Sequence, residues 1–87
     1  MIEKEIEVIN RAGIHTRPAS MIVKTTAKYK SDIYLIRDGF SINAKSIIGV
    51  MTLAAAQGEK LTIRADGPDE SEAVESLSKI FADGFGE

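Results

Sequence analysis

The sequence predicts a single α+β domain over residues 1–87, a β-sheet with helices on one face in the order βαββαβα. Four short segments have the composition of strands, and three have apolar residues at helical spacing. Two strand–helix–strand crossovers with right-handed connections would bury helices on the same face of the sheet. A chain of 87 residues has room for one such core.

The expected strands cover residues 2–8, 32–37, 40–44 and 60–66. In the first strand Ile2, Ile6 and Val8 alternate with glutamates, which is typical of a strand with one face in water. Asp38 and Gly39 separate the second and third strands and indicate a hairpin, because both turn positions need positive φ.

The expected helices cover residues 16–29, 46–55 and about 69–83. The first has Pro18 in its opening turn, where a missing N–H costs nothing, and Ser46 is a plausible N-cap of the second. Acidic residues fill the first turn of the third helix, and Gly84 ends it. The expected buried stripe of the first helix comprises Ala19, Ile22, Val23, Thr26 and Ala27.

Composition excludes several classes of protein. There is no cysteine, so neither disulfides nor a thiolate metal site can hold the fold together. The first residues lack the pattern of a signal peptide, and no apolar run approaches the ~20 residues of a membrane span. We therefore expect a cytoplasmic protein without membrane insertion.

The charges are segregated along the chain although the net charge is only -2. Five basic residues and no acidic one lie between Glu7 and Asp32, whereas acidic residues dominate from Asp66 onward. A basic region favours an anionic partner, either an acidic protein surface or a phosphate. Nucleic acid is not expected, because the region has almost no aromatic residues on which bases could stack. A solvated helix face would explain the same pattern.

The only histidine, His15, lies where a loop meets the first expected helix. Free N–H groups and the positive end of the helix dipole should lie near its ring, and Arg17 follows two residues later as a forked donor for phosphate oxygens. Neutral imidazole is a competent nucleophile near cytoplasmic pH. Gly13 gives the preceding loop conformational freedom, and Pro18 fixes the helix entry that positions Thr16 and Arg17. These features favour phosphate chemistry on His15.

Other roles for His15 have less support. A metal site would need further ligands, and no second histidine is present. Nothing marks a hydrolytic triad or a nucleotide-binding glycine loop. We expect no metal, no cofactor and no complete reaction catalysed by this chain alone.

A second segment of interest starts at Ser46, which we expect to be a helix N-cap and also a site that can be phosphorylated. The helix after it is apolar nearly all round, so about half of its large side chains should stay exposed if one face is buried. Exposed patches of this kind mark docking sites, although complete burial is the alternative. The residues concerned are Ile47, Ile48, Val50, Met51 and Leu53.

The whole chain closely resembles the HPr family of histidine-containing phosphocarriers, which serve the bacterial phosphoenolpyruvate-dependent phosphotransferase system. The resemblance is carried by Gly-Ile-His-Thr-Arg-Pro-Ala at residues 13–19 and Lys-Ser-Ile-Ile-Gly-Val-Met at residues 45–51. It implies an open-faced β-sandwich, in which three helices cover one face of a four-stranded antiparallel sheet.

The resemblance also implies the roles of individual residues. Nδ1 of His15 would accept a phosphoryl group from enzyme I and pass it to the A domain of a sugar-specific enzyme II, with Arg17 stabilising the phosphate. Ser46 would be the regulatory site of HPr kinase/phosphorylase. The docking patch would comprise Ile47, Ile48 and Met51, and the basic segment with Lys24 would complement acidic partners. We expect a monomer that acts in sugar transport and carbon catabolite regulation.

Three alternatives remain open. The carrier could serve regulatory, nitrogen-linked phosphotransfer instead of sugar uptake. It could be an interaction module in which phosphorylated Ser46 binds a transcription regulator, although relatives specialised in this way lack the acceptor histidine. A small-ligand regulatory domain with a similar element order would explain neither Arg17 nor the apolar helix.

Overall fold

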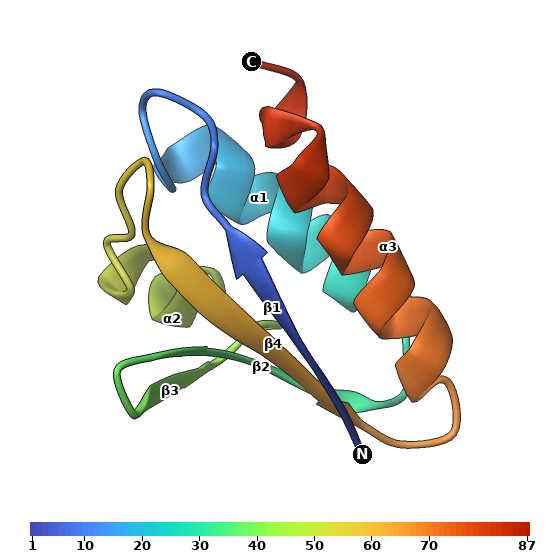
Figure 1. Cartoon of the computed structure of the whole chain (residues 1–87). Helices are drawn as coiled ribbons and strands as arrows, with labels where there is room; N and C mark the ends of the chain where they lie inside the picture. The colour runs from blue at the N-terminus through green and yellow to red at the C-terminus, as the bar shows by residue number, and fades with distance from the viewer.

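A computed structural model describes all 87 residues and confirms the predicted α+β fold. Figure 1 shows the sheet with its helices gathered on one side. The strands are β1 (Ile2–Glu7), β2 (Asp32–Arg37), β3 (Phe40–Asn43) and β4 (Lys60–Asp66). The helices are α1 (Thr16–Thr26), α2 (Ile47–Thr52) and α3 (Glu70–Ala82), followed by the 3₁₀ turn η1 (Gly84–Gly86).

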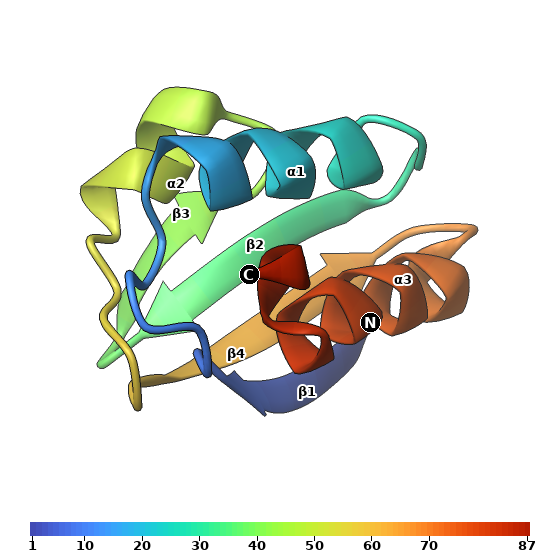
Figure 2. The ribbon, with the colours of Figure 1, turned by 90° about the horizontal axis from the view of Figure 1, so that it is seen from above.

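The sheet has the order β1-β4-β2-β3, and all neighbouring strands are antiparallel. Figure 2 shows α1 and α3 crossing the same face of the sheet, with α2 beside α1. The predicted hairpin turn between β2 and β3 is confirmed, because Asp38 and Gly39 have φ of 50° and 80°. The other face carries no helix and is the open side of the sandwich.

The core lies between the sheet and the helices. Alternate residues of β4, Leu61, Ile63 and Ala65, are buried, as the period of two requires. Two aromatic rings close the core at the end of the chain, where Phe85 packs edge-on against Phe81 at 4.9 Å between centroids.

Two predicted helices end earlier than expected. Helix α1 stops at Thr26, and Ala27, expected in the buried stripe, is exposed. The hydroxyl of Thr26 donates to the carbonyl of Ala44 at 2.9 Å, which ties the helix end to the segment before α2. Helix α2 stops at Thr52 because Ala54 adopts a left-handed φ of 49° and cannot continue the helix.

The start of α3 is tied to the loop before β2 by Asp69. Its carboxylate accepts hydrogen bonds from the hydroxyl of Ser31 at 2.5 Å and from the backbone N–H groups of Ser31 and Lys30, both at 2.9 Å. These donors stabilise the charged form, led by the Ser31 hydroxyl, and lower the pKa of Asp69 from 3.8 to about 2.

Asp69→Asn should therefore lower the stability at neutral pH and flatten the loss of stability in acid. A carboxyl group with a depressed pKa contributes stability that is complete above pH 3.8 and is lost as the pH falls through about 2. Urea unfolding should show a lower free energy of unfolding for Asp69→Asn than for the wild type at pH 7. The difference between the two free energies should be smaller at pH 2. Asp38→Asn, in an exposed turn that suits either residue, is the control; an equal gap at both pH values would refute the assignment.

Candidate functional site

His15 is the N-cap residue of α1. Its backbone is extended, with φ of -120° and ψ of -163°, and its carbonyl accepts the helical hydrogen bond of Ala19 at 2.9 Å. The imidazole does not cap the helix, so the ring projects from the helix start with 43% of its side chain exposed. Thr16 and Arg17 are exposed in the first turn, and Pro18 is buried beneath them. His15 therefore lies at the start of the helix, as the sequence predicts.

The loop that carries His15 is pinned at Gly13 and Ile14. The N–H of Ile14 donates to the carbonyl of Ala55 at 2.9 Å, and Gly13 has φ of 70°. A Cβ at Gly13 would lie only 2.5 Å from that same carbonyl oxygen. Glycine is therefore required both for the left-handed backbone and for the close approach of the two segments.

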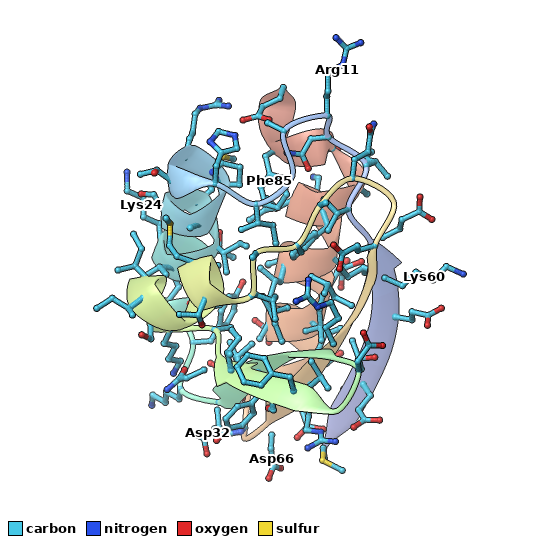
Figure 3. The ribbon with its side chains drawn as sticks, turned by 90° about the vertical axis from the view of Figure 1, so that its left-hand side faces the viewer. Arg11, Lys24, Asp32, Lys60, Asp66 and Phe85 are labelled. Carbon is cyan, nitrogen blue, oxygen red and sulfur yellow. The ribbon has the colours of Figure 1, made fainter.

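Two residues that sequence reasoning missed complete the site. The Nε2–H of His15 donates to Oε2 of Glu87 at 2.9 Å, and Nη1 of Arg17 lies 3.4 Å from the same oxygen. The other oxygen, Oε1, accepts from Nδ2 of Asn10 at 3.0 Å. The turn η1 brings Glu87 here, and buried Phe85, labelled in Figure 3, anchors that turn. Contacts that span 70 residues or more leave no local signal in a single sequence.

The environment keeps the Glu87 carboxylate charged. The hydrogen bond from Asn10 lowers its pKa most, the hydrogen bond from His15 and the guanidinium of Arg17 lower it further, and desolvation opposes them. No pocket surrounds these groups. A phosphoryl group on the ring would be held at an open surface, and Arg17, with 59% of its side chain exposed, has room to turn towards it.

Figure 3 shows where several charged side chains lie on the molecule. In Figure 3, Arg11 projects from the end that holds Phe85 and the start of α1. Asp32 and Asp66 project from the opposite end, and Lys24 lies on the flank formed by α1 and α2. The end with His15 thus carries the basic Arg11 and Arg17 together with the Glu87 carboxylate.

Ser46 is the N-cap of α2, which confirms the capping prediction. Its hydroxyl oxygen accepts from the N–H of Gly49 at 3.1 Å. The neighbouring Lys45 donates from Nζ to the carbonyl of Tyr29 at 2.8 Å, which joins this segment to the end of α1. No hydrogen bond links Ser46 with His15, Arg17 or Glu87.

The α2 patch, which we define as Ile47, Ile48 and Met51, is exposed by 44%, 74% and 42%, respectively. Val50 and Leu53 of the same segment are fully buried. The expectation that about half of these apolar side chains stay outside the core is therefore confirmed. Helices α1 and α2 are in contact, so the patch lies on the same flank as exposed Lys24.

Comparison with known proteins agrees with this fold. A family model described as the PTS HPr component phosphorylation site matches residues 2–83. The phosphocarrier protein HPr of Treponema pallidum (strain Nichols) is 44% identical over 87 residues, which cover 100% of this chain and 99% of that protein. The crystal structure of HPr-C-His from Thermoanaerobacter tengcongensis has a TM-score of 0.96 and 41% identity, and the match covers 100% of this chain and 98% of that one.

A further relative is the Bacillus subtilis catabolite repression containing protein Crh. Its crystal structure has a TM-score of 0.78 and 38% identity, and the match covers 97% of each chain. That structure is reported as an intertwined dimer with a swapped domain. The monomer expected for this chain therefore stays a prediction.

The fold, the family model and the relatives together identify a component of the phosphotransferase system. The chain belongs to the HPr family, whose members are phosphocarrier proteins rather than enzymes. Its partners are accordingly other components of that system. None of its helices has the length and apolar composition needed to cross a membrane.

Proposed function

We propose that Nδ1 of His15 accepts a phosphoryl group from enzyme I, derived from phosphoenolpyruvate, and donates it to the A domain of a sugar-specific enzyme II. The observation that carries this proposal is the partly exposed ring at the start of α1, with Arg17 in the first turn. Nε2 is occupied by Glu87, so the nitrogen left for chemistry is Nδ1. A cytoplasmic location is part of the proposal.

The geometry suits a group that must be held and then released. Unpaired N–H groups of the first turn, around Thr16, and the guanidinium of Arg17 would stabilise the phosphate charge. Pro18, buried under this turn, fixes its backbone. An open surface leaves the phosphoryl group accessible for in-line attack by the next acceptor, which a closed pocket would hinder.

The direct test is phosphorylation by a purified enzyme I with magnesium and phosphoenolpyruvate. Intact mass and peptide mapping should find one acid-labile, base-stable phosphoryl group on His15. A control carrier confirms that enzyme I is active. If the control is phosphorylated and this protein is not, the carrier function is wrong.

We further propose that the α2 patch and Lys24 form the docking surface for these partners. The apolar side chains offer area to bury, and Lys24 offers charge complementary to an acidic partner. Ile48→Ser should raise the KM for transfer from enzyme I about tenfold, because one well-packed isoleucine contributes roughly 1.5 kcal/mol or more when buried. Phe40→Ser, which alters another exposed apolar residue in β3, is the control. Equal KM values for both variants would exclude this surface.

Ser46 is proposed as a regulatory phosphorylation site for HPr kinase/phosphorylase. Its position beside the α2 patch supports this proposal, because a phosphate there would add negative charge to the docking surface. It could also create a surface for a transcription regulator and so contribute to carbon catabolite regulation. Service in nitrogen-linked phosphotransfer, without sugar uptake, is the alternative.

Ser46→Asp should slow transfer to His15 about tenfold without unfolding the domain. Aspartate is as good an N-cap as serine, so α2 should keep its start, while the carboxylate repels acidic partners. Time-resolved phosphoryl-transfer assays measure the rate of transfer to His15, and thermal melts measure the stability of the domain. Ser46→Ala is the matched control: it should lose about 1 kcal/mol of stability and keep the transfer rate. Equal transfer rates for the aspartate variant and the wild type would contradict the regulatory role.

A further inference from the structure

A chain of hydrogen bonds joins the imidazole of His15 to a buried amide. Asn10 is 5% exposed, and its Nδ2 donates to the carbonyl of Gly13 at 2.7 Å and to Oε1 of Glu87 at 3.0 Å. The second carboxylate oxygen, Oε2, accepts from Nε2 of His15 at 2.9 Å. Glu87 is thus clamped between a fixed donor and the imidazole ring.

The orientation of the Asn10 amide follows from its partners. Nδ2 faces two acceptors, a carbonyl and a carboxylate, so the flipped amide would set oxygen against oxygen at both. The price of this orientation is that the buried Oδ1 accepts no hydrogen bond. An unsatisfied buried acceptor lowers stability. Asn10 is therefore a poor choice for the core alone, and its amide holds both the loop carbonyl of Gly13 and the carboxylate of Glu87.

The carboxylate selects one form of the neutral ring. A charged carboxylate can only accept, so Nε2 must carry the proton and the lone pair is left on Nδ1. Nε2 makes the only hydrogen bond of the ring. Metal-bound and catalytic histidines are oriented in the same way by a partner on the second nitrogen.

We propose that Glu87, clamped by Asn10, is a positioning residue for phosphoryl transfer: it presents Nδ1 as the nucleophile and stabilises the positive charge of the phosphorylated ring. This inference rests on the proposed function of His15 as the acceptor. It assigns separate tasks to the two charged neighbours. Glu87 acts on the ring through Nε2. Arg17 lies 3.4 Å from the carboxylate and is largely exposed, so its guanidinium is free to turn towards the phosphate.

No proton needs to move in the step. The Nδ1 lone pair of His15 forms the new bond to phosphorus, and the bond to the donor breaks with its electron pair left on the donor. The ring then carries one positive charge and keeps its Nε2–H, which donates to Glu87. When the next acceptor attacks phosphorus, the electron pair of the N–P bond returns to Nδ1 and the ring leaves neutral. A carboxylate at Nε2 stabilises the positively charged, phosphorylated ring, whether the phosphoryl group is arriving from the donor or about to leave for the acceptor.

The test is a competition for phosphate at equilibrium. Wild-type protein labelled with ¹⁵N is mixed with an equal amount of an unlabelled variant, catalytic enzyme I and limiting phosphoenolpyruvate. The label separates the two proteins by mass, so intact mass reports how phosphate is divided between them. We expect Glu87→Gln, which keeps an acceptor and removes the charge, to hold about tenfold less phosphate than the wild type. Asn10→Ala should shift the division in the same direction by a smaller factor. Glu75→Gln, at an exposed position of α3, should divide phosphate equally.

The outcomes separate the two proposals. If the wild type and the Glu75→Gln control are phosphorylated on His15 but Glu87→Gln carries an equal or larger share, the positioning role is wrong and the carrier function stands. If neither is phosphorylated, the carrier function itself fails. A measurement that needs no phosphate is ¹⁵N NMR of the neutral ring, where Glu87→Ala should increase the share protonated on Nδ1. Unchanged ring nitrogen shifts in that variant would also overturn the inference.

Discussion

His15→Ala is expected to abolish phosphoryl acceptance while the domain keeps its stability. The imidazole is the only side chain at the start of α1 with a nucleophilic nitrogen, and 43% of it is exposed, so little packing is lost. The free energy of unfolding should change by about 0.5 kcal/mol or less, as for surface substitutions in general. Enzyme I, phosphoenolpyruvate and intact mass measure acceptance, and urea unfolding measures stability.

Arg17→Ala is the comparison variant for His15→Ala, and we expect it to have a partial effect on phosphoryl transfer. It leaves the nucleophile in place and removes a phosphate partner, so it should slow transfer without abolishing it. Any phosphoryl group that enzyme I adds to the His15→Ala protein would show that another residue is the acceptor. The proposed function would then have to be abandoned.

Gly13→Ala should have the largest effect on stability among substitutions near the site. The added Cβ would meet the backbone oxygen of Ala55 at 2.5 Å, and φ of 70° is unfavourable for alanine. Left-handed strain of about 1–2 kcal/mol and overpacking of about 1–3 kcal/mol predict a loss of roughly 3 kcal/mol. Because the loop also positions His15, transfer should slow by about tenfold or more.

Gly39→Ala is a matched control for Gly13→Ala. Comparison of the two variants separates the strain of the left-handed backbone from the clash of the added Cβ with Ala55. Gly39 has φ of 80°, yet nothing lies within 4 Å of an added Cβ. It should lose only about 1–2 kcal/mol, from the left-handed backbone alone, and should transfer phosphate at the wild-type rate. Urea unfolding and a transfer assay on both variants give the comparison. Equal losses in the two proteins would mean that the contact with Ala55 adds no strain.

Periodicity was sufficient to predict most of the fold. Alternation in β4 and helical spacing in α3 report burial directly, because one face of each element is covered along its whole length. Helix ends were harder to predict. Ala27 extends an apolar pattern, but the side chain of Thr26 bonds to the distant Ala44, and α1 ends there. The contact with Ala44 is a tertiary contact, which a local pattern does not contain.

The candidate site, like the fold, has one part that a local sequence pattern predicts and another that depends on tertiary contacts. His15 and Arg17 are two residues apart, so their joint placement at a helix start follows from the sequence alone. Asn10 and Glu87 are 77 residues apart and meet because Phe85 adopts a left-handed φ of 58° and buries its ring. No propensity favours a left-handed phenylalanine. Local reasoning therefore finds the histidine at the helix start and misses Glu87, which is hydrogen-bonded to it, and Asn10, which is hydrogen-bonded to Glu87.

The α2 patch bears on how this carrier could change over evolutionary time. Its exposed side chains contribute little to the core, whereas the neighbouring Val50 and Leu53 are fully buried. In the proposed docking role, substitutions in the patch should therefore change partner preference at small cost in folding free energy. Selection can act on recognition and on folding through different residues of one six-residue helix and its flank. A shuttle that must suit several partners can thus diverge in recognition while the scaffold that holds its histidine stays the same.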